Sequence, residues 1–208
     1  MALDVKRAID KYNLCCFADM QDEHPTLWRG PRWTLAILLA ILGMLGPFSI
    51  DTMFPAFPQI GEQFAADKVA LQQTISAYLF AYALMSLVHG PLSDAVGRKS
   101  FIVGALLFLA IPTALIAQSP SIGWIGMWRF MQGLSVPGIT VVTIAYIGEE
   151  FEGRAVTELM SFYVSGSVLG GFMGRFLLGH LHEYIGWRAG YYVMAAMTLI
   201  GALWVGKM

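Results

Sequence analysis

Six long apolar segments follow one another along the chain after residue 32. They run over residues 33–57, 71–92, 101–117, 122–148, 156–178 and 189–205. A helix needs about 20 mainly apolar residues to cross the hydrocarbon core of a bilayer, and its backbone must pair its own polar groups there. The segments lack the alternation of apolar and polar residues that barrel strands show. The pattern therefore predicts an all-α membrane protein, a bundle of six transmembrane helices joined by short loops.

The composition agrees with lipid as the main surroundings. Of the 208 residues, 57% are hydrophobic and 13% are charged, whereas about a quarter of the residues of a soluble domain are charged. The net charge of −1 gives no indication of a nucleic-acid partner. Residues 1–32 form a polar tail without the apolar core of a secretory signal. Cys15 and Cys16 in this tail are adjacent, so they indicate no disulfide framework, and reduced bystanders are favoured over lipidation sites.

The basic residues predict how the chain lies across the membrane. Alternate loops place nine of them on one side, and only Lys68 and Arg188 on the other. The nine are Lys6, Arg7, Lys11, Arg29, Arg32, Arg98, Lys99, Arg154 and Lys207. By the positive-inside rule this side is cytoplasmic. An even number of spans also requires both termini to share a side, so both are predicted to be cytoplasmic.

The turn between the second and third segments carries a distinctive string. Residues 90–99 read Gly-Pro-Leu-Ser-Asp-Ala-Val-Gly-Arg-Lys. Gly90 allows another helix to approach closely, Pro91 disfavours continuation of the helix, and Gly97 permits a tight turn. Asp94 is then free to accept charge-assisted hydrogen bonds. The basic pair that ends the string favours a cytoplasmic position.

This string resembles the Gly-x-Leu-x-Asp-x-x-Gly-Arg-Lys signature of the major facilitator superfamily, which also follows the second span. The resemblance covers nearly all of residues 33–208 and implies the N-terminal six-helix half of such a transporter, with a 3+3 inverted repeat. It implies that the turn is a conformational latch, a contact that holds the two halves together in one state and releases them in another. The implied latch residues are Gly90, Leu92, Asp94, Gly97, Arg98 and Lys99.

Two further strings resemble the same family. In the fourth segment, Arg129, Gln132 and Gly133 match the family's Arg-x-x-Gln-Gly pattern, and Glu149, Glu150, Gly153 and Arg154 follow. Residues 51–58 read Asp-Thr-Met-Phe-Pro-Ala-Phe-Pro, which resembles the pattern of the drug:proton antiporters. The second resemblance implies proton-coupled efflux of a small organic solute.

Residues 179–188 resemble residues 90–99, which supports an inverted repeat. In this alignment Gly179 corresponds to Gly90 and Gly186 to Gly97. Leu181, Glu183 and Arg188 correspond to Leu92, Asp94 and Lys99. The first string is predicted to face inward and the second outward, as an inverted repeat requires. A chance match between two membrane turns is the alternative.

Asp51 and Arg129 are the candidate proton-coupling residues. An ionisable side chain at membrane depth is costly and is a functional hypothesis by default. Both residues are expected roughly 10 Å below the outer surface, at 1.5 Å per helical residue. If their faces meet, Arg129 stabilises ionised Asp51, and protonation of Asp51 weakens the pair. In the alternative, Arg129 extends outward to the surface and Asp51 reaches interfacial water.

The fifth segment combines a small-residue face with a charge. Gly166, Gly170, Gly171 and Gly174 suit close helix contact. Arg175 either faces a cavity and attracts an anionic substrate, or extends to the nearby surface. This segment lacks the Gly-Pro pair of the antiporters. His180 and His182 lie near the outer loop, where solvated histidines are favoured over a metal site.

Other functional classes are less well supported by the sequence. An intramembrane serine protease would need a histidine in the sixth segment near a serine such as Ser135, and that segment has none. A glycine-rich phosphate-binding loop is also lacking. We therefore expect neither an enzyme nor a cofactor. A channel or membrane scaffold would share the hydropathy pattern but has no need for a latch.

The sequence ends just after the sixth segment, so it encodes one wall of the expected substrate cavity. We expect no transport by the monomer. The missing wall is expected to be either a separate C-terminal six-helix half, in a truncated or split reading frame, or a second copy of this chain. The other expected partners are the lipid bilayer, protons and a small-molecule substrate of unknown identity. The expected location is a bacterial inner membrane.

Overall fold

A computed structural model of the chain describes residues 32–207, apart from the side chains of residues 32, 178 and 181–183. The predicted tail therefore lies outside the described residues except for its last position, and so do Cys15 and Cys16. The side chain of His182 is outside them as well.

The described part of the chain consists of helices and short connections. Their bounds are α2 Arg32–Asp51, α3 Met53–Phe64, α4 Lys68–Val96, α5 Arg98–Ala117, α6 Ile122–Glu150, α7 Gly153–Ile185 and α8 Trp187–Lys207. Only Thr52 separates α2 from α3, so these two helices form one interrupted span. The predicted all-α bundle is confirmed, and the helices extend beyond most of the predicted segment ends.

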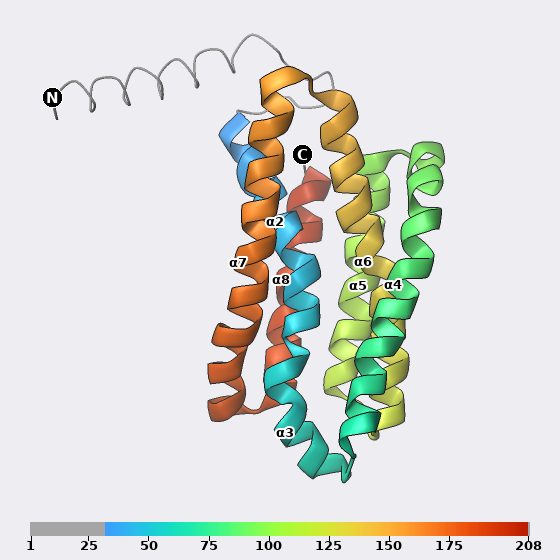
Figure 1. Cartoon of the computed structure of the whole chain (residues 1–208), viewed down its shortest axis with the longest axis vertical. Coiled ribbons are helices and arrows are strands. Elements are labelled where there is room, and N and C mark those ends of the chain that lie inside the picture. Colours follow the sequence, from blue (N-terminus) through green and yellow to red (C-terminus); the bar gives the residue numbers. More distant parts are fainter. Residues whose placement is uncertain (1–31, 208) are drawn as a thin grey trace, which may run out of the picture.

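Five spans among the described residues are long and apolar enough to cross a membrane: α2 with α3, α4, α5, α6 and α8. The remaining predicted span, residues 156–178, corresponds to α7, which carries four glycines and Arg175 within its C-terminal half. Helix α7 nevertheless runs alongside α2 over most of its length (Figure 1). It thereby completes the bundle of six.

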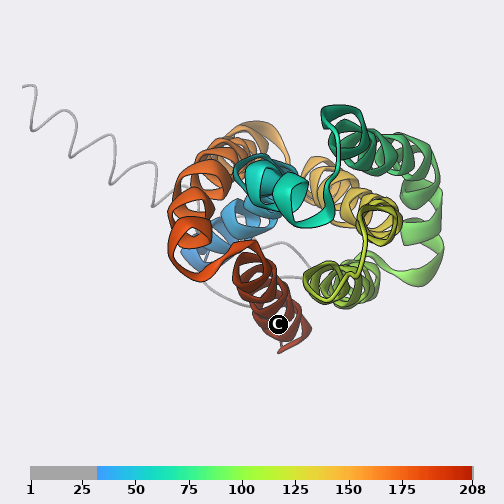
Figure 2. The ribbon, with the colours of Figure 1, turned by 90° about the horizontal axis from the view of Figure 1, so that it is seen from below.

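The connections alternate between the two ends of the bundle (Figure 1). The α4–α5 and α6–α7 connections lie at the end where α2 begins, which we call the Arg98 end. The α3–α4 and α7–α8 connections lie at the other end, which we call the Trp187 end. Seen along the bundle, α5 and α8 lie together on one side, while α7, α2 with α3, and α4 lie along the opposite side (Figure 2).

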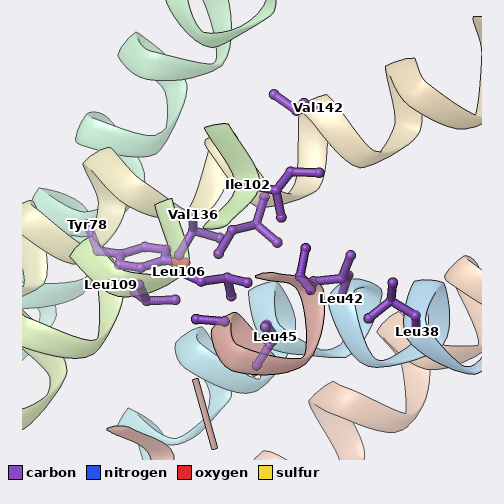
Figure 3. Close-up of a cluster of buried hydrophobic side chains, with 12 residues drawn as sticks. Leu38, Leu42, Leu45, Tyr78, Ile102, Leu106, Leu109, Val136 and Val142 are labelled. Atoms are coloured by element: carbon purple, nitrogen blue, oxygen red, sulfur yellow. The ribbon is translucent and has the colours of Figure 1, made fainter. Parts of the chain in front are cut away.

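The centre of the bundle is filled by aliphatic side chains from α2, α5, α6 and α8, together with Tyr78 from α4 (Figure 3). Leu106, Leu109 and Val136 in this cluster are fully buried. Many equally apolar side chains point outward, and Leu87 on α4 is 79% exposed. Because lipid is as apolar as the core, burial of apolar groups does not by itself select this packing. Close fit between helices must contribute more.

Glycines on α7 bring it close to α2. A Cβ atom added to Gly166 would lie 2.7 Å from the Cα of Ala40, and one added to Gly170 would lie 2.8 Å from the Cα of Met44. These obstacles are backbone atoms, which no side-chain rotation can move. The backbones of α2 and α7 therefore approach at a distance that only glycine permits at these positions.

The two turns aligned by the internal repeat share a backbone feature. Gly97 connects α4 to α5 with φ of 93°, and Gly186 lies between α7 and α8 with φ of 79°. Positive φ favours glycine because it has no Cβ. The two turns lie at opposite ends of the bundle (Figure 1). This arrangement is the one that an inverted repeat produces.

The expectation that Pro91 ends its helix is wrong. Helix α4 continues through Pro91 to Val96 and ends at Gly97. The Pro91 ring lies on an exposed part of the helix, and the Ser93 hydroxyl donates a 2.8 Å hydrogen bond to the Gly90 carbonyl one turn earlier. Membrane helices tolerate proline where side chains like this one pair nearby backbone groups.

The close approach of α2 and α7 predicts a sharp difference between two glycines. Gly166→Ala should lower the free energy of unfolding by about 1–3 kcal/mol, because the new methyl group overlaps the α2 backbone. The matched control is Gly104→Ala in α5, where a Cβ meets nothing within 4 Å. This control should leave stability unchanged or raise it by up to about 1 kcal/mol, because alanine favours helix more than glycine does. Denaturant unfolding in detergent measures both. Equal effects would contradict the packing.

Candidate functional site

Arg129 is the largest fully buried side chain among the described residues. From α6, its Nη1 donates to the Ser49 carbonyl at 2.8 Å and to Gln132 Oε1 at 3.0 Å. Its Nη2 donates to the Ile50 carbonyl at 3.4 Å. Gln132 in turn donates from Nε2 to Thr113 Oγ1 at 2.7 Å. The Arg129 network therefore joins α6 to the end of α2 and to α5.

The hydrogen bonding of the span changes where α2 meets α3. Pro55 has no N–H to give to the Asp51 carbonyl one turn earlier, and Thr52 stands between α2 and α3. Thr52 keeps a helical backbone conformation, and both its N–H and its hydroxyl donate to the Phe48 carbonyl, at 3.1 and 2.6 Å. Arg129 adds donors to the carbonyls of the two residues before Asp51.

The buried charge of Arg129 is surrounded by polar and aromatic groups. The acceptors that the structure gives it are two backbone carbonyls and an amide oxygen. Its guanidinium carbon also lies 5.1 Å from the centre of the Tyr78 ring, a distance at which a cation is attracted to an aromatic face. Gly133 makes this approach of α4 possible, because a Cβ there would lie 2.9 Å from the Ala81 Cβ and would meet the Tyr78 backbone.

The expected contact between Asp51 and Arg129 is wrong. Asp51 Oδ1 instead accepts from Nε of Arg175 at 2.8 Å and lies 2.8 Å from its Nη2. Residues 49 and 51 point about 200° apart on a helix, so the carbonyl that Arg129 binds and the Asp51 side chain lie on different faces of α2. Position along the chain predicts the depth of each residue in the membrane. It does not predict the direction in which each side chain points around the axis of its own helix.

Glycines on α7 make room for the Asp51 carboxylate. A Cβ added to Gly171 would lie 2.8 Å from Asp51 Oδ2, and one added to Gly174 would lie 3.2 Å from the Asp51 Cβ. The Asp51 side chain is 15% exposed, whereas that of Arg175 is 66% exposed. The Arg175 guanidinium carbon also lies 5.2 Å from the centre of the Phe54 ring. Arg175 is therefore held in place, yet it presents much of its surface outward.

A second charged group lies at the Arg98 end. Arg98 Nη2 donates to Asp94 Oδ1 at 3.2 Å and forms an ion pair with Glu149. These residues come from α5, α4 and α6, and the Arg98 side chain is 19% exposed. A cavity of about 890 Å³ opens beside the group and reaches the first two turns of α2. The α4–α5 turn is thereby tied to the end of α6.

The surface of the predicted latch is exposed among the described residues. A Cβ on Gly90 would meet nothing within 4 Å, and Leu92 is 44% exposed. Lys99 is also exposed. The predicted approach of another helix to Gly90 therefore stays a prediction about a surface that the described residues leave uncovered.

Several partners of the candidate residues were not found from the sequence. Ser49 and Thr113 gave no signal, because single hydroxyl residues are common in membrane helices. Glu149 was noted only as following the fourth span, and its pairing with Arg98 depends on how α5 meets α6. Arg175, the partner of Asp51, was expected to face a cavity or to extend to the surface, and not to pair with Asp51.

The sequence profile of the Major Facilitator Superfamily matches residues 30–207. The inner membrane transport protein YnfM of Escherichia coli is 32% identical over 176 residues, 85% of this chain and 42% of the relative. The chloramphenicol resistance protein CraA of Acinetobacter baumannii is 31% identical over 179 residues, 84% of this chain and 42% of the relative. A bicyclomycin resistance protein homolog of Haemophilus influenzae is 25% identical, over 80% of this chain and 42% of the relative.

This chain belongs to the major facilitator superfamily, a family of multi-pass membrane transporters. It is similar to relatives that include two proteins named for drug resistance. It spans about 42% of the length of these relatives. The family and the helical bundle agree with the resemblance found in the sequence.

The Arg129 network predicts that lysine cannot replace this arginine. Arg129→Lys should lower the free energy of unfolding by about 1.5–3 kcal/mol, because a single ammonium cannot keep the spread of contacts that the planar guanidinium makes. The control is Arg188→Lys. Arg188 is exposed and lies 5.4 Å over the Trp187 ring, so this change should cost less than about 0.5 kcal/mol. Detergent unfolding followed by tryptophan fluorescence measures both, and a similar small loss in the two variants would contradict the role of Arg129.

Proposed function

We propose that this chain forms one half of a proton-coupled secondary transporter that moves a small organic solute by alternating access. The observation that carries this proposal is the ion pair between Asp51 on α2 and Arg175 on α7, at membrane depth in a member of a transporter family. Ionisable residues within membrane spans commonly mark substrate and proton pathways. The resistance proteins among the relatives support efflux as the direction.

Proton coupling follows from where Asp51 lies. Protonation of its carboxyl group removes the charge that holds Arg175, and so weakens the contact between α2 and α7. Asp51 is the last residue of α2, directly before the interruption at Thr52. Arg129 holds the carbonyls of the two preceding residues. In the proposed cycle, Asp51 exchanges the proton, and Arg129 keeps the helix end in position while the Asp51–Arg175 contact forms and breaks.

The Arg98 end supplies the proposed latch. Asp94, Arg98 and Glu149 tie the α4–α5 turn to α6, which presents Gly90 and Leu92 on an open face. A second six-helix unit packed against this face would be held in one state and released when the charged group rearranges. Alternating access needs such a contact between two units around a shared substrate site.

The second unit is proposed to be either a C-terminal six-helix half or another copy of this chain. Either would supply the second wall of the cavity and would cover the α4 face, where large apolar side chains such as Phe80 are exposed. The Arg98 end is proposed to face the cytoplasm of a bacterium, with both termini on that side, because the basic residues gather there.

Asp51→Asn tests proton coupling. In proteoliposomes that hold the chain together with its second half, transport driven by a pH gradient should fall at least about tenfold, because asparagine cannot exchange a proton. Membrane insertion should be unchanged, as judged by carbonate extraction. Asp67→Asn is the matched control, since Asp67 only accepts a hydrogen bond from the Ala70 N–H at the start of α4, and asparagine caps helices equally well.

Full pH-driven transport by Asp51→Asn would end the proposal of coupling through this residue. Solute flux that does not depend on the pH gradient, through the unsubstituted protein or the Asp51→Asn variant, would favour a channel instead.

Crosslinking at Gly90 tests the latch face and identifies the second unit. The chain is prepared with Cys15→Ser and Cys16→Ser, and Gly90→Cys is then compared with Gly104→Cys. Among the described residues, a Cβ at either glycine would meet nothing within 4 Å, but only Gly90 belongs to the proposed contact. A short bifunctional thiol–amine crosslinker should join Gly90→Cys to a second unit in native membranes, with much less product from Gly104→Cys. The mass of the product tells a second copy from a separate half, and equal yields at the two positions would contradict the latch.

A further inference from the structure

We propose that the surface around Arg175 binds an organic anion with an aromatic or other apolar body, and that this is the substrate class of the transporter. The inference rests on the proposed function only in taking this surface as part of the substrate path. An aspartate at membrane depth would by itself suggest a site for organic cations. The proposed substrate has the opposite charge.

The Arg175 guanidinium is only partly used within the chain. Its Nε and Nη2 both approach the same oxygen, Asp51 Oδ1, each at 2.8 Å. Among the residues that the structure describes, its remaining contact is with the face of the Phe54 ring. Nη1 and the outer edge of the group stay available, in agreement with a side chain that is 66% exposed. Arginine suits this task because its planar fork can bind two anions from different edges.

The Asp51 carboxylate is shielded from the same side. It is only 15% exposed, with Oδ1 covered by Arg175 and Oδ2 lying against the Gly171 backbone. A ligand that reaches this surface therefore meets the cation first. An anion in contact with the guanidinium would lie about twice as far from the carboxylate, so its attraction would be about twice its repulsion. A cation in the same position would be repelled by the guanidinium about twice as strongly as it is attracted by the carboxylate.

The surroundings of Arg175 favour an apolar body on that anion. Phe54 is 41% exposed, and its ring lies 5.7 Å from that of Phe57. On α7, Phe172 lies three residues before Arg175, which places the two on neighbouring positions of one helix face. Phe172 is 59% exposed and stacks on Phe176 at 5.4 Å with an interplanar angle of 10°. Exposed aromatic rings close to a cation that is held by Asp51 suit a flat anion such as an aryl carboxylate.

The competing explanation is that Arg175 only neutralises Asp51. The two explanations predict opposite effects of removing the Asp51 charge. If Arg175 is only a structural partner, Asp51→Asn leaves ligand binding unchanged or harms it. If Arg175 binds an anion, Asp51→Asn removes the nearest repulsive charge and strengthens binding.

The experiment uses a matched pair of probes, 2-naphthoate and 2-naphthylmethylammonium, which share a ring system and differ in the sign of their charge. Binding to the 208-residue chain in phosphatidylcholine nanodiscs is measured by equilibrium dialysis, with empty nanodiscs to subtract partition into lipid. The variants are Arg175→Gln, Asp51→Asn and Arg188→Gln. Arg188 is the control because it is exposed at the same end of the bundle and also lies over an aromatic ring.

Saturable binding of 2-naphthoate, tighter than that of the ammonium probe, is the expected result. Arg175→Gln should weaken it about tenfold or more, because a charge-assisted hydrogen bond is lost. Asp51→Asn should strengthen it about threefold, and Arg188→Gln should change it by less than about twofold. The proposal is overturned if the ammonium probe binds more tightly, if naphthoate binding is not saturable, or if the two arginine variants lose affinity equally.

These results are separable from the proposed transport function. If naphthoate binds as expected but Asp51→Asn keeps full pH-driven transport, the anion site stands and proton coupling through Asp51 fails. If proton coupling through Asp51 holds but the ammonium probe binds better, only the substrate class is wrong.

Discussion

The pairing of the α2 carbonyls by Arg129 is the interaction on which the other features depend. A buried guanidinium in a bilayer must find its acceptors within the protein, since lipid offers no hydrogen bonds. Arg129 finds them in the carbonyls of Ser49 and Ile50 and is itself held by Gln132 and by the face of the Tyr78 ring. These contacts hold α6 against the end of α2, directly before the ionisable Asp51.

The two membrane charges have separate tasks as a result. Arg129 is fully buried and donates to two backbone carbonyls of α2, so it is suited to hold the shape of the span. Arg175 is exposed and is paired with Asp51, so it is suited to meet a ligand and to respond to the charge on Asp51. Gly166 and Gly170 bring the α7 backbone against that of α2. The same close approach places Arg175 beside Asp51.

The sequence was most informative where a single residue type has few alternatives. Gly97 and Gly186 were aligned by a repeat, and both occupy turns with positive φ. It was least informative where the outcome depends on direction around a helix axis. Asp51 and Arg129 were matched in depth, but the Arg129 side chain from α6 meets a different face of α2 from the one that carries the Asp51 side chain. The expectation for Pro91 was wrong because a membrane helix can continue through proline, as α5 and α6 also do at the buried Pro112 and Pro137.

The sequence by itself determined the number of apolar segments and the family. These features follow from local composition, because the thickness and polarity of the bilayer act on each segment separately. Only the tertiary structure decided that Asp51 pairs with Arg175, that Arg129 binds the end of α2, and that Arg98 joins Glu149 to Asp94. Those contacts depend on how helices rotate and pack against one another. Packing of that kind depends on small differences in how closely helices fit together, and the apolar pattern of a membrane helix gives little information about them.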